Sequence, residues 1–166
     1  MASVEEVEKL FESKIKELNE TLPQKYTRNV MTTRNCAAWT VASILDILKI
    51  DDLNIINMAS PLAGIADICG AVNGGLMMVG LIAGNRGEKE IPQFIAAAEG
   101  VKFVKYFERE FKTSKCQELC GYDLLTTEGM QNYIKENVWG KQCYKQVVKA
   151  VELIGKLYKK KIVKII

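Results

Sequence analysis

Five cysteines are the residues of this chain best suited to chemistry. They stand at Cys36, Cys69, Cys116, Cys120 and Cys143. An odd number excludes complete pairing in disulfides within the chain. The chain opens with an acidic segment instead of a hydrophobic signal, so we expect a cytoplasmic protein. In such a protein, cysteines more often bind metal or react as thiols than form structural disulfides.

Composition narrows the chemistry further, because the sequence contains no histidine. Ser-His-Asp catalysis, Cys-His catalysis and zinc sites with imidazole ligands are therefore excluded. The net charge of +3 is weak and the basic residues are scattered among acids, so we expect no nucleic-acid partner. A hydrophobic content of 48% and a charged content of 26% are typical of a globular domain.

The second cysteine opens an apolar, glycine-rich stretch from Ile68 to Gly84. Gly70 and Gly74 are four residues apart and therefore share one face of a helix. Because glycine costs about 1 kcal/mol inside a helix, we expect a facing helix or a bound group to approach closely there. The alternative is a tightly packed core helix whose cysteine is simply a small apolar residue. Asp67 and Asn73 interrupt the stretch, so a buried helix is favoured over membrane insertion.

Helical periodicity extends over most of the remaining chain and predicts an all-α fold. A single compact domain over residues 1–166, with about six to seven helices, is expected. The N-terminal helix lies within residues 1–24, with a Ser3–Glu6 capping box, and Pro23 ends it. Further helices are predicted over 33–49, 52–59, 68–84, 90–111, 116–120, 127–139 and 141–158. No convincing strand is found.

Two of these segments carry more detailed predictions. The core face of helix 90–111 is expected to hold Phe94, Ile95, Ala98, Val101, Val104 and Phe107. The tail from Lys159 to Ile166 alternates basic and apolar residues, and a helix end, a short strand and a contact arm all stay open.

Four cysteines are predicted to lie in the first turn of a helix: Cys36, Cys69, Cys116 and Cys143. Thr33, Asp67 and the Ser114–Gln117 capping box are the expected helix caps. The positive end of a helix lowers the pKa of a thiol, and the thiolate is the form that binds metals. Four such thiolates aimed at a common centre would form an all-cysteine metal site. The sequence contains no Cys-x-x-Cys, so neither a thioredoxin motif nor a zinc ribbon is indicated.

The cysteine segments also resemble a known family. They are Asn35-Cys36-Ala37, the motif Cys69-Gly70-Ala71-Val72-Asn73-Gly74, Cys116-Gln117-Glu118-Leu119 and Cys143. This series, over roughly residues 27–151, resembles the family of redox-active proteins named C_GCAxxG_C_C, whose label writes the first two letters of the central motif in the other order. A similar region occurs in the split-Soret cytochromes, which carry a non-haem iron centre.

The resemblance implies an iron–sulfur cluster or thiol redox chemistry. It implies cluster ligands at Cys36, Cys69, Cys116 and Cys143, with Gly70 and Gly74 allowing close approach. A [2Fe–2S] cluster is favoured and a [4Fe–4S] cluster is the second choice, since both take four cysteines. The expected function is electron transfer with a partner protein, and whether the chain catalyses a reaction stays open.

Two other functions compete with cluster binding. Cys120 lies one helical turn from Cys116, so Cys116 and Cys120, or Cys69 and Cys116, are candidates for a thiol–disulfide pair. A structural four-cysteine metal site is the third possibility. Trp39 or Trp139 is a candidate to shield a cluster from water. A homodimer is plausible through the apolar stripe of helix 3–20.

Overall fold

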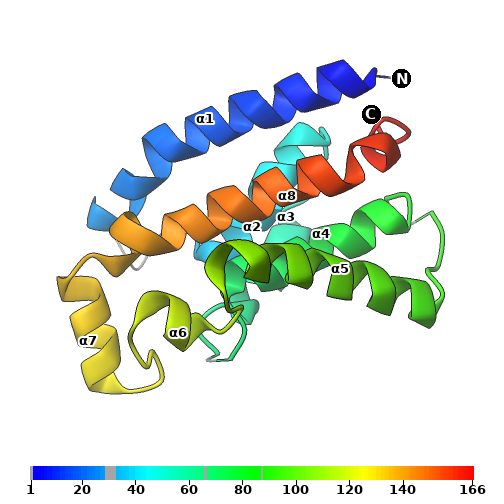
Figure 1. Ribbon diagram of the computed structural model, residues 1–166. Coiled ribbons are helices and arrows are strands. Elements are labelled where there is room, and N and C mark those ends of the chain that lie inside the picture. The colour runs from blue at the N-terminus through cyan, green and yellow to red at the C-terminus, as the bar shows by residue number, and fades with distance from the viewer. Residues whose placement is uncertain (1, 29–32, 66, 87) are drawn as a thin grey trace.

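Helices build the whole fold of the described residues, which confirms the all-α prediction (Figure 1). The computed structural model describes residues 2–28, 33–65, 67–86 and 88–166. These form eight α-helices, one for each predicted helical segment although a total of about six to seven was expected, with one 3₁₀ and one π-helical segment. In order they are α1 (Val4–Arg28), α2 (Cys36–Ile47), α3 (Leu53–Ala59), η1 (Ser60–Leu62), α4 (Gly70–Ala83), α5 (Gln93–Phe111), α6 (Cys116–Cys120), α7 (Thr127–Lys135), η2 (Trp139–Cys143) and α8 (Tyr144–Ile162).

The core forms around α4 and α8. Helix α8 packs on α1, α2, α4 and α5, while α4 packs on α2, α5 and α8. The inward face of the last helix contains Val147, Val151, Ile154 and Tyr158, which are all buried. Helix α4 has 14 residues and spans about 21 Å, less than the ~30 Å of a bilayer core. Among the described helices, none is both long and apolar enough to cross a membrane.

The predicted end of the first helix at Pro23 is wrong. Helix α1 continues through Pro23 to Arg28. Its start is as predicted, because Ser3 and Glu6 form the reciprocal hydrogen bonds of a capping box. The tertiary structure outweighs the proline: Leu22 is fully buried, and the Pro23 carbonyl oxygen lies against Gly140. The apolar stripe of α1, including Val7 and Phe11, is buried where α1 packs on α8.

The predicted core face of α5 is only partly correct. Phe107 is buried, but Phe94, Ile95 and Val101 are 84%, 47% and 53% exposed, and Ala98 is exposed as well. The buried face instead contains Phe103, whose ring lies against Gly75 of α4. The first turns of α5 thus leave their apolar side chains in solvent, which periodicity alone does not reveal.

The two ends of the chain meet at one end of the molecule, and α6 and α7 lie at the other (Figure 1). The Ala2 amide donates to the Ile166 carbonyl oxygen at 3.1 Å. The sequence left a helix end, a short strand and a contact arm open for the tail, and a helix end is observed. Helix α8 runs to Ile162, and Ile162 and the following Ile165 are buried. The candidate site lies at the opposite end, beside α6 and α7.

Candidate functional site: a cavity lined by cysteines

All five cysteines line one cavity of about 190 Å³. Its other walls are mainly apolar and include Leu119, Leu124, Met130 and Trp139. No charged side chain is found among the described residues that line it. All five cysteines therefore border one largely apolar space, although they come from four separate parts of the chain.

Cys36 is the first residue of α2, as predicted, but Asn35 and not Thr33 caps this helix. The Asn35 side-chain oxygen accepts a hydrogen bond from the Ala38 amide at 3.1 Å. Its side-chain nitrogen donates to the Ser60 carbonyl oxygen at 2.7 Å. The first asparagine of the family segment thus fixes both the start of α2 and its distance from η1.

An isolated antiparallel bridge between Ile68 and Lys115 brings Cys69 and Cys116 together. The Cys69 amide donates to the Ser114 carbonyl oxygen, and the Cys116 amide donates to the Asp67 carbonyl oxygen, both at 2.8 Å. Two cysteines far apart in the sequence are therefore attached to one backbone pairing. Such a pairing, two residues wide, has no recognisable sequence pattern.

The bridge also changes the predicted caps of α4 and α6. Cys69 itself is the N-cap of α4, so Asp67 does not have that role. Ser114 does not form a capping box with Gln117, because its hydroxyl donates to the Glu108 carboxylate at 2.6 Å. Asp67 and Ser114 thus take part in the backbone bridge between distant segments, and neither caps the helix that follows it.

Cys143 does not lie in the first turn of a helix, so that prediction is wrong. It is the last residue of η2, which continues directly into α8. Gly140, which separates the predicted helices 127–139 and 141–158, lies within η2, and a Cβ there would lie 2.7 Å from the Pro23 carbonyl oxygen. The π-helical segment positions Cys143 toward the cavity, and such segments are frequent at functional sites.

Cys120 is the fifth cysteine of the cavity and is 3% exposed. It ends the short helix α6, at the predicted residue, and Gly121 closes the helix in the left-handed conformation, φ +80°. As a thiol, Cys120 donates to the Tyr122 carbonyl oxygen at 3.2 Å. Its position on the same helix as Cys116 places both sulfur atoms at the cavity.

The surroundings of Gly70 and Gly74 show which groups approach α4 closely. A Cβ on Gly74 would lie 2.6 Å from the Ala37 carbonyl oxygen, and one on Gly70 would lie 3.2 Å from the Ala37 amide nitrogen. At Gly74 the approaching group is thus the backbone of α2, whereas at Gly70 the Ala63 Cβ comes nearer still, at 2.7 Å. Asn73 of the same motif donates to the Leu62 carbonyl oxygen at 2.8 Å, which holds the loop that forms another wall of the cavity.

The thiols are hydrogen-bonded in two pairs, Cys36 with Cys143 and Cys116 with Cys120. The hydrogen bond between the two thiols of each pair, together with burial, raises the pKa of Cys36 in one pair and of Cys116 in the other. The same bonds lower the pKa of Cys143, and that of Cys120 to about 6.

Cys69 stands outside the two pairs. Burial raises the pKa of Cys69 to about 11, against the opposing effect of the Ala71 and Val72 amides. The expectation that helix starts lower the pKa is therefore wrong for Cys36, Cys69 and Cys116. At Cys69 the loss of thiolate hydration outweighs the effect of the helix start, whereas at Cys36 and Cys116 the hydrogen bond with the paired thiol is the larger cause of the raised pKa.

Tyr133 is part of the site, although no motif or spacing in the sequence indicates it. Its hydroxyl donates to the Cys143 sulfur at 3.4 Å, and its side chain is 7% exposed. Of the two tryptophans, Trp139 lines the cysteine cavity and Trp39 does not. No spacing rule connects a tyrosine in one helix with a cysteine ten residues later, so only the packing identifies it.

The cysteines line a volume larger than one ion or one water molecule would fill. Within the described part of the chain, which includes all five cysteines, no three Cys, Asp or Glu side chains converge as they would around one metal ion. The cavity volume also exceeds the ~30 Å³ that one water molecule occupies in the liquid. The space therefore suits a group of several atoms.

The comparison with protein families agrees with this grouping of cysteines. Residues 34–157 match the family described as "Putative redox-active protein (C_GCAxxG_C_C)". The chain belongs to this family. The match includes all five cysteines of the cavity and confirms the resemblance seen in the sequence. Neither a curated protein nor a solved structure matches the chain.

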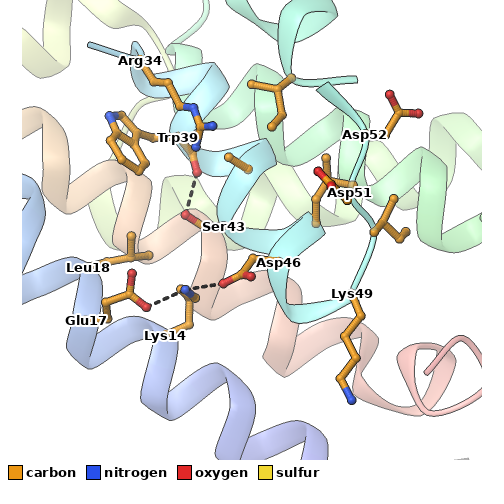
Figure 2. Close-up of a pocket in the computed structure, with 14 residues that line it drawn as sticks. Lys14, Glu17, Leu18, Arg34, Trp39, Ser43, Asp46, Lys49, Asp51 and Asp52 are labelled. Carbon is orange, nitrogen blue, oxygen red and sulfur yellow. Dashed lines mark hydrogen bonds and ion pairs between the residues drawn. The ribbon is translucent and has the colours of Figure 1, made fainter. Parts of the chain in front are cut away.

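A larger, open groove of about 580 Å³ lies on α1 and α2, away from the cysteines (Figure 2). Lys14 crosses it and forms ion pairs with Glu17 and Asp46, each at 2.5 Å. Trp39 stands in its wall, with the Arg34 guanidinium 5.4 Å from the ring centre. Lys14 is therefore already paired within the protein.

Proposed function

We propose that the cysteine cavity binds an iron–sulfur cluster and that the protein transfers electrons. The proposed ligands are Cys36, Cys69, Cys116 and Cys143. The observation that carries this proposal is that the four cysteines of the family pattern line a single cavity. A [2Fe–2S] cluster is preferred, with [4Fe–4S] as the alternative.

The donor set and the shape of the cavity fit such a cluster. Thiolate sulfur is the usual ligand of iron–sulfur clusters. A cluster binds its cysteines through different iron atoms, so the sulfurs need not converge on one point. At the start of α4, the Ala71 and Val72 amides favour the negative charge of a Cys69 thiolate, although burial opposes them. When bound, the cluster would accept and donate single electrons.

The apolar lining has a role of its own. Trp139 is 1% exposed and, with Leu119 and Leu124, keeps water from the sulfur atoms. Solvent exposure is one of the factors that set the potential of a cluster. We expect a redox partner protein to receive or supply the electron. Homodimerisation stays a prediction, and the stripe of α1 that suggested it is covered by α8.

The test is reconstitution of the purified protein with iron and sulfide in the absence of oxygen. Iron and acid-labile sulfide are counted, and visible absorption and EPR spectra are recorded. We expect a coloured protein, with loss of colour in each Cys→Ala variant of the four ligands. Cys120→Ala is the matched control and should keep its cluster. A colourless wild-type protein without iron or sulfide would refute the proposal.

A second candidate function is thiol–disulfide exchange, favoured by the hydrogen-bonded pair Cys116 and Cys120. Both thiols would lose a proton and one electron each to form a disulfide, while a disulfide of a partner is reduced to two thiols. Cys69 with Cys116 is the other possible pair. Thiol counting after exposure to oxidised glutathione tests this function, and five free thiols would contradict it. A structural metal site is distinguished from both by metal analysis.

A further inference from the structure

Tyr133 lines the cavity, and its hydroxyl reaches a cysteine sulfur. Besides the cysteines, the described residues of the lining include four side chains with polar atoms: Asn35, Tyr133, Trp139 and Gln146. Asn35 donates to the Ser60 carbonyl oxygen. The amide of Gln146, oriented to satisfy its bonds, donates to the carbonyl oxygens of Gln142 and Cys143. Tyr133 differs from both because its hydroxyl donates to the Cys143 Sγ at 3.4 Å.

The position of Tyr133 is fixed by helix α7. Thr126 caps this helix by accepting a hydrogen bond from the Gly129 amide at 3.0 Å. Gly129 packs so closely on the preceding loop that a Cβ there would lie 1.9 Å from the Asp123 carbonyl oxygen. Gly129 and Tyr133 are four residues apart and are the buried residues of α7. The helix is thus seated through one face, which directs the tyrosine hydroxyl into the cavity.

We propose that Tyr133 is a positioning residue that holds the Cys143 sulfur and raises the reduction potential of the bound cluster. This inference rests on the proposed function. A hydrogen bond donated to a ligand sulfur stabilises negative charge on it, and the reduced cluster carries one more negative charge than the oxidised form. The bond is therefore stronger in the reduced form, which shifts the potential upward.

The experiment compares the reconstituted wild-type protein with Tyr133→Phe, which removes the hydroxyl and keeps the ring. Tyr106→Phe is the matched control, because Tyr106 lies on α5 outside the cavity and stacks on Arg109. Potentials are measured by redox titration followed in the visible spectrum, together with iron and sulfide content. In Tyr133→Phe we expect the ratio of reduced to oxidised cluster at a given applied potential to fall roughly tenfold. For a one-electron couple this corresponds to a reduction potential about 59 mV lower than that of the wild type. Tyr106→Phe should match the wild type.

Each other outcome has a defined meaning. An unchanged or higher potential in a fully loaded Tyr133→Phe protein overturns the inference. A variant that folds, by circular dichroism, yet fails to load while Tyr106→Phe loads supports it, since the sulfur is then out of position. A variant that does not fold overturns it, because the hydroxyl then serves the fold. If the wild type and Tyr106→Phe also bind no iron, the proposed function itself has failed.

Discussion

Single residues control how closely α2 and α4 approach at the edge of the cavity. Gly74 faces the backbone of α2, whereas Gly80, in the same helix, has no atom within 4 Å of where its Cβ would be. The two glycines are alike in local sequence terms, and only the packing distinguishes them. They therefore form a natural pair for measuring the effect of that contact.

We predict that Gly74→Ala lowers the free energy of unfolding by about 1–3 kcal/mol, because the new methyl group meets backbone atoms of Ala37 that cannot move aside easily. Gly80→Ala is the control and should be neutral or stabilising by up to about 1 kcal/mol, since alanine is the better helix former. Urea unfolding monitored by circular dichroism measures both. Equal effects would show that the contact between the helices is not tight.

At the scale of elements, the cavity is formed by short segments attached to a core of longer helices. Cys69 and Cys116 lie beside a two-residue backbone bridge, and Cys143 ends a π-helical segment. Helix α7 has nine residues and adds Tyr133. Because isolated helices of this length are marginal in water, α7 depends on its cap and on its buried face.

We predict that Thr126→Ala destabilises α7 by about 1 kcal/mol, because the Gly129 amide loses its side-chain acceptor. Hydrogen exchange of the α7 amides should become faster, with little change in α8. Thr127→Ala, at the adjacent exposed position, is the control. Unchanged exchange in Thr126→Ala would mean that the buried face alone holds the helix.

At the scale of the whole molecule, a polar cluster connects α5 to the end of α8, far from the cysteines. Lys161 donates to the Glu99 carboxylate at 2.7 Å, and Tyr158 donates to the Glu99 carbonyl oxygen at 3.2 Å. The hydrogen bond from Lys161 lowers the pKa of Glu99, although partial burial opposes it. Folding therefore favours the ionised form of this carboxyl group.

This pKa shift predicts a pH dependence of stability. Glu99 stabilises the fold above its unfolded pKa of about 4.3, and the contribution is lost as the pH falls through the lower folded pKa. Between pH 6 and pH 3, the melting temperature of Glu99→Gln should fall less than that of the wild type. Glu12→Gln, on the exposed side of α1, should follow the wild type. Parallel curves for all three proteins would exclude a role for the Glu99–Lys161 pair.

The sequence by itself determined the helical class, most helix positions and the four cysteines of the family pattern. Helical periodicity and the Ser3–Glu6 capping box depend on residues within a few positions of one another, so they can be read locally. The tertiary structure decided that all five cysteines share a cavity, that Gly74 meets α2 and that Phe94 is exposed. It also showed that Cys143 lies in a π-helical segment and that the Tyr133 hydroxyl donates a hydrogen bond to the Cys143 sulfur. These features depend on contacts between segments far apart in the chain, and such contacts exist only once the helices have packed.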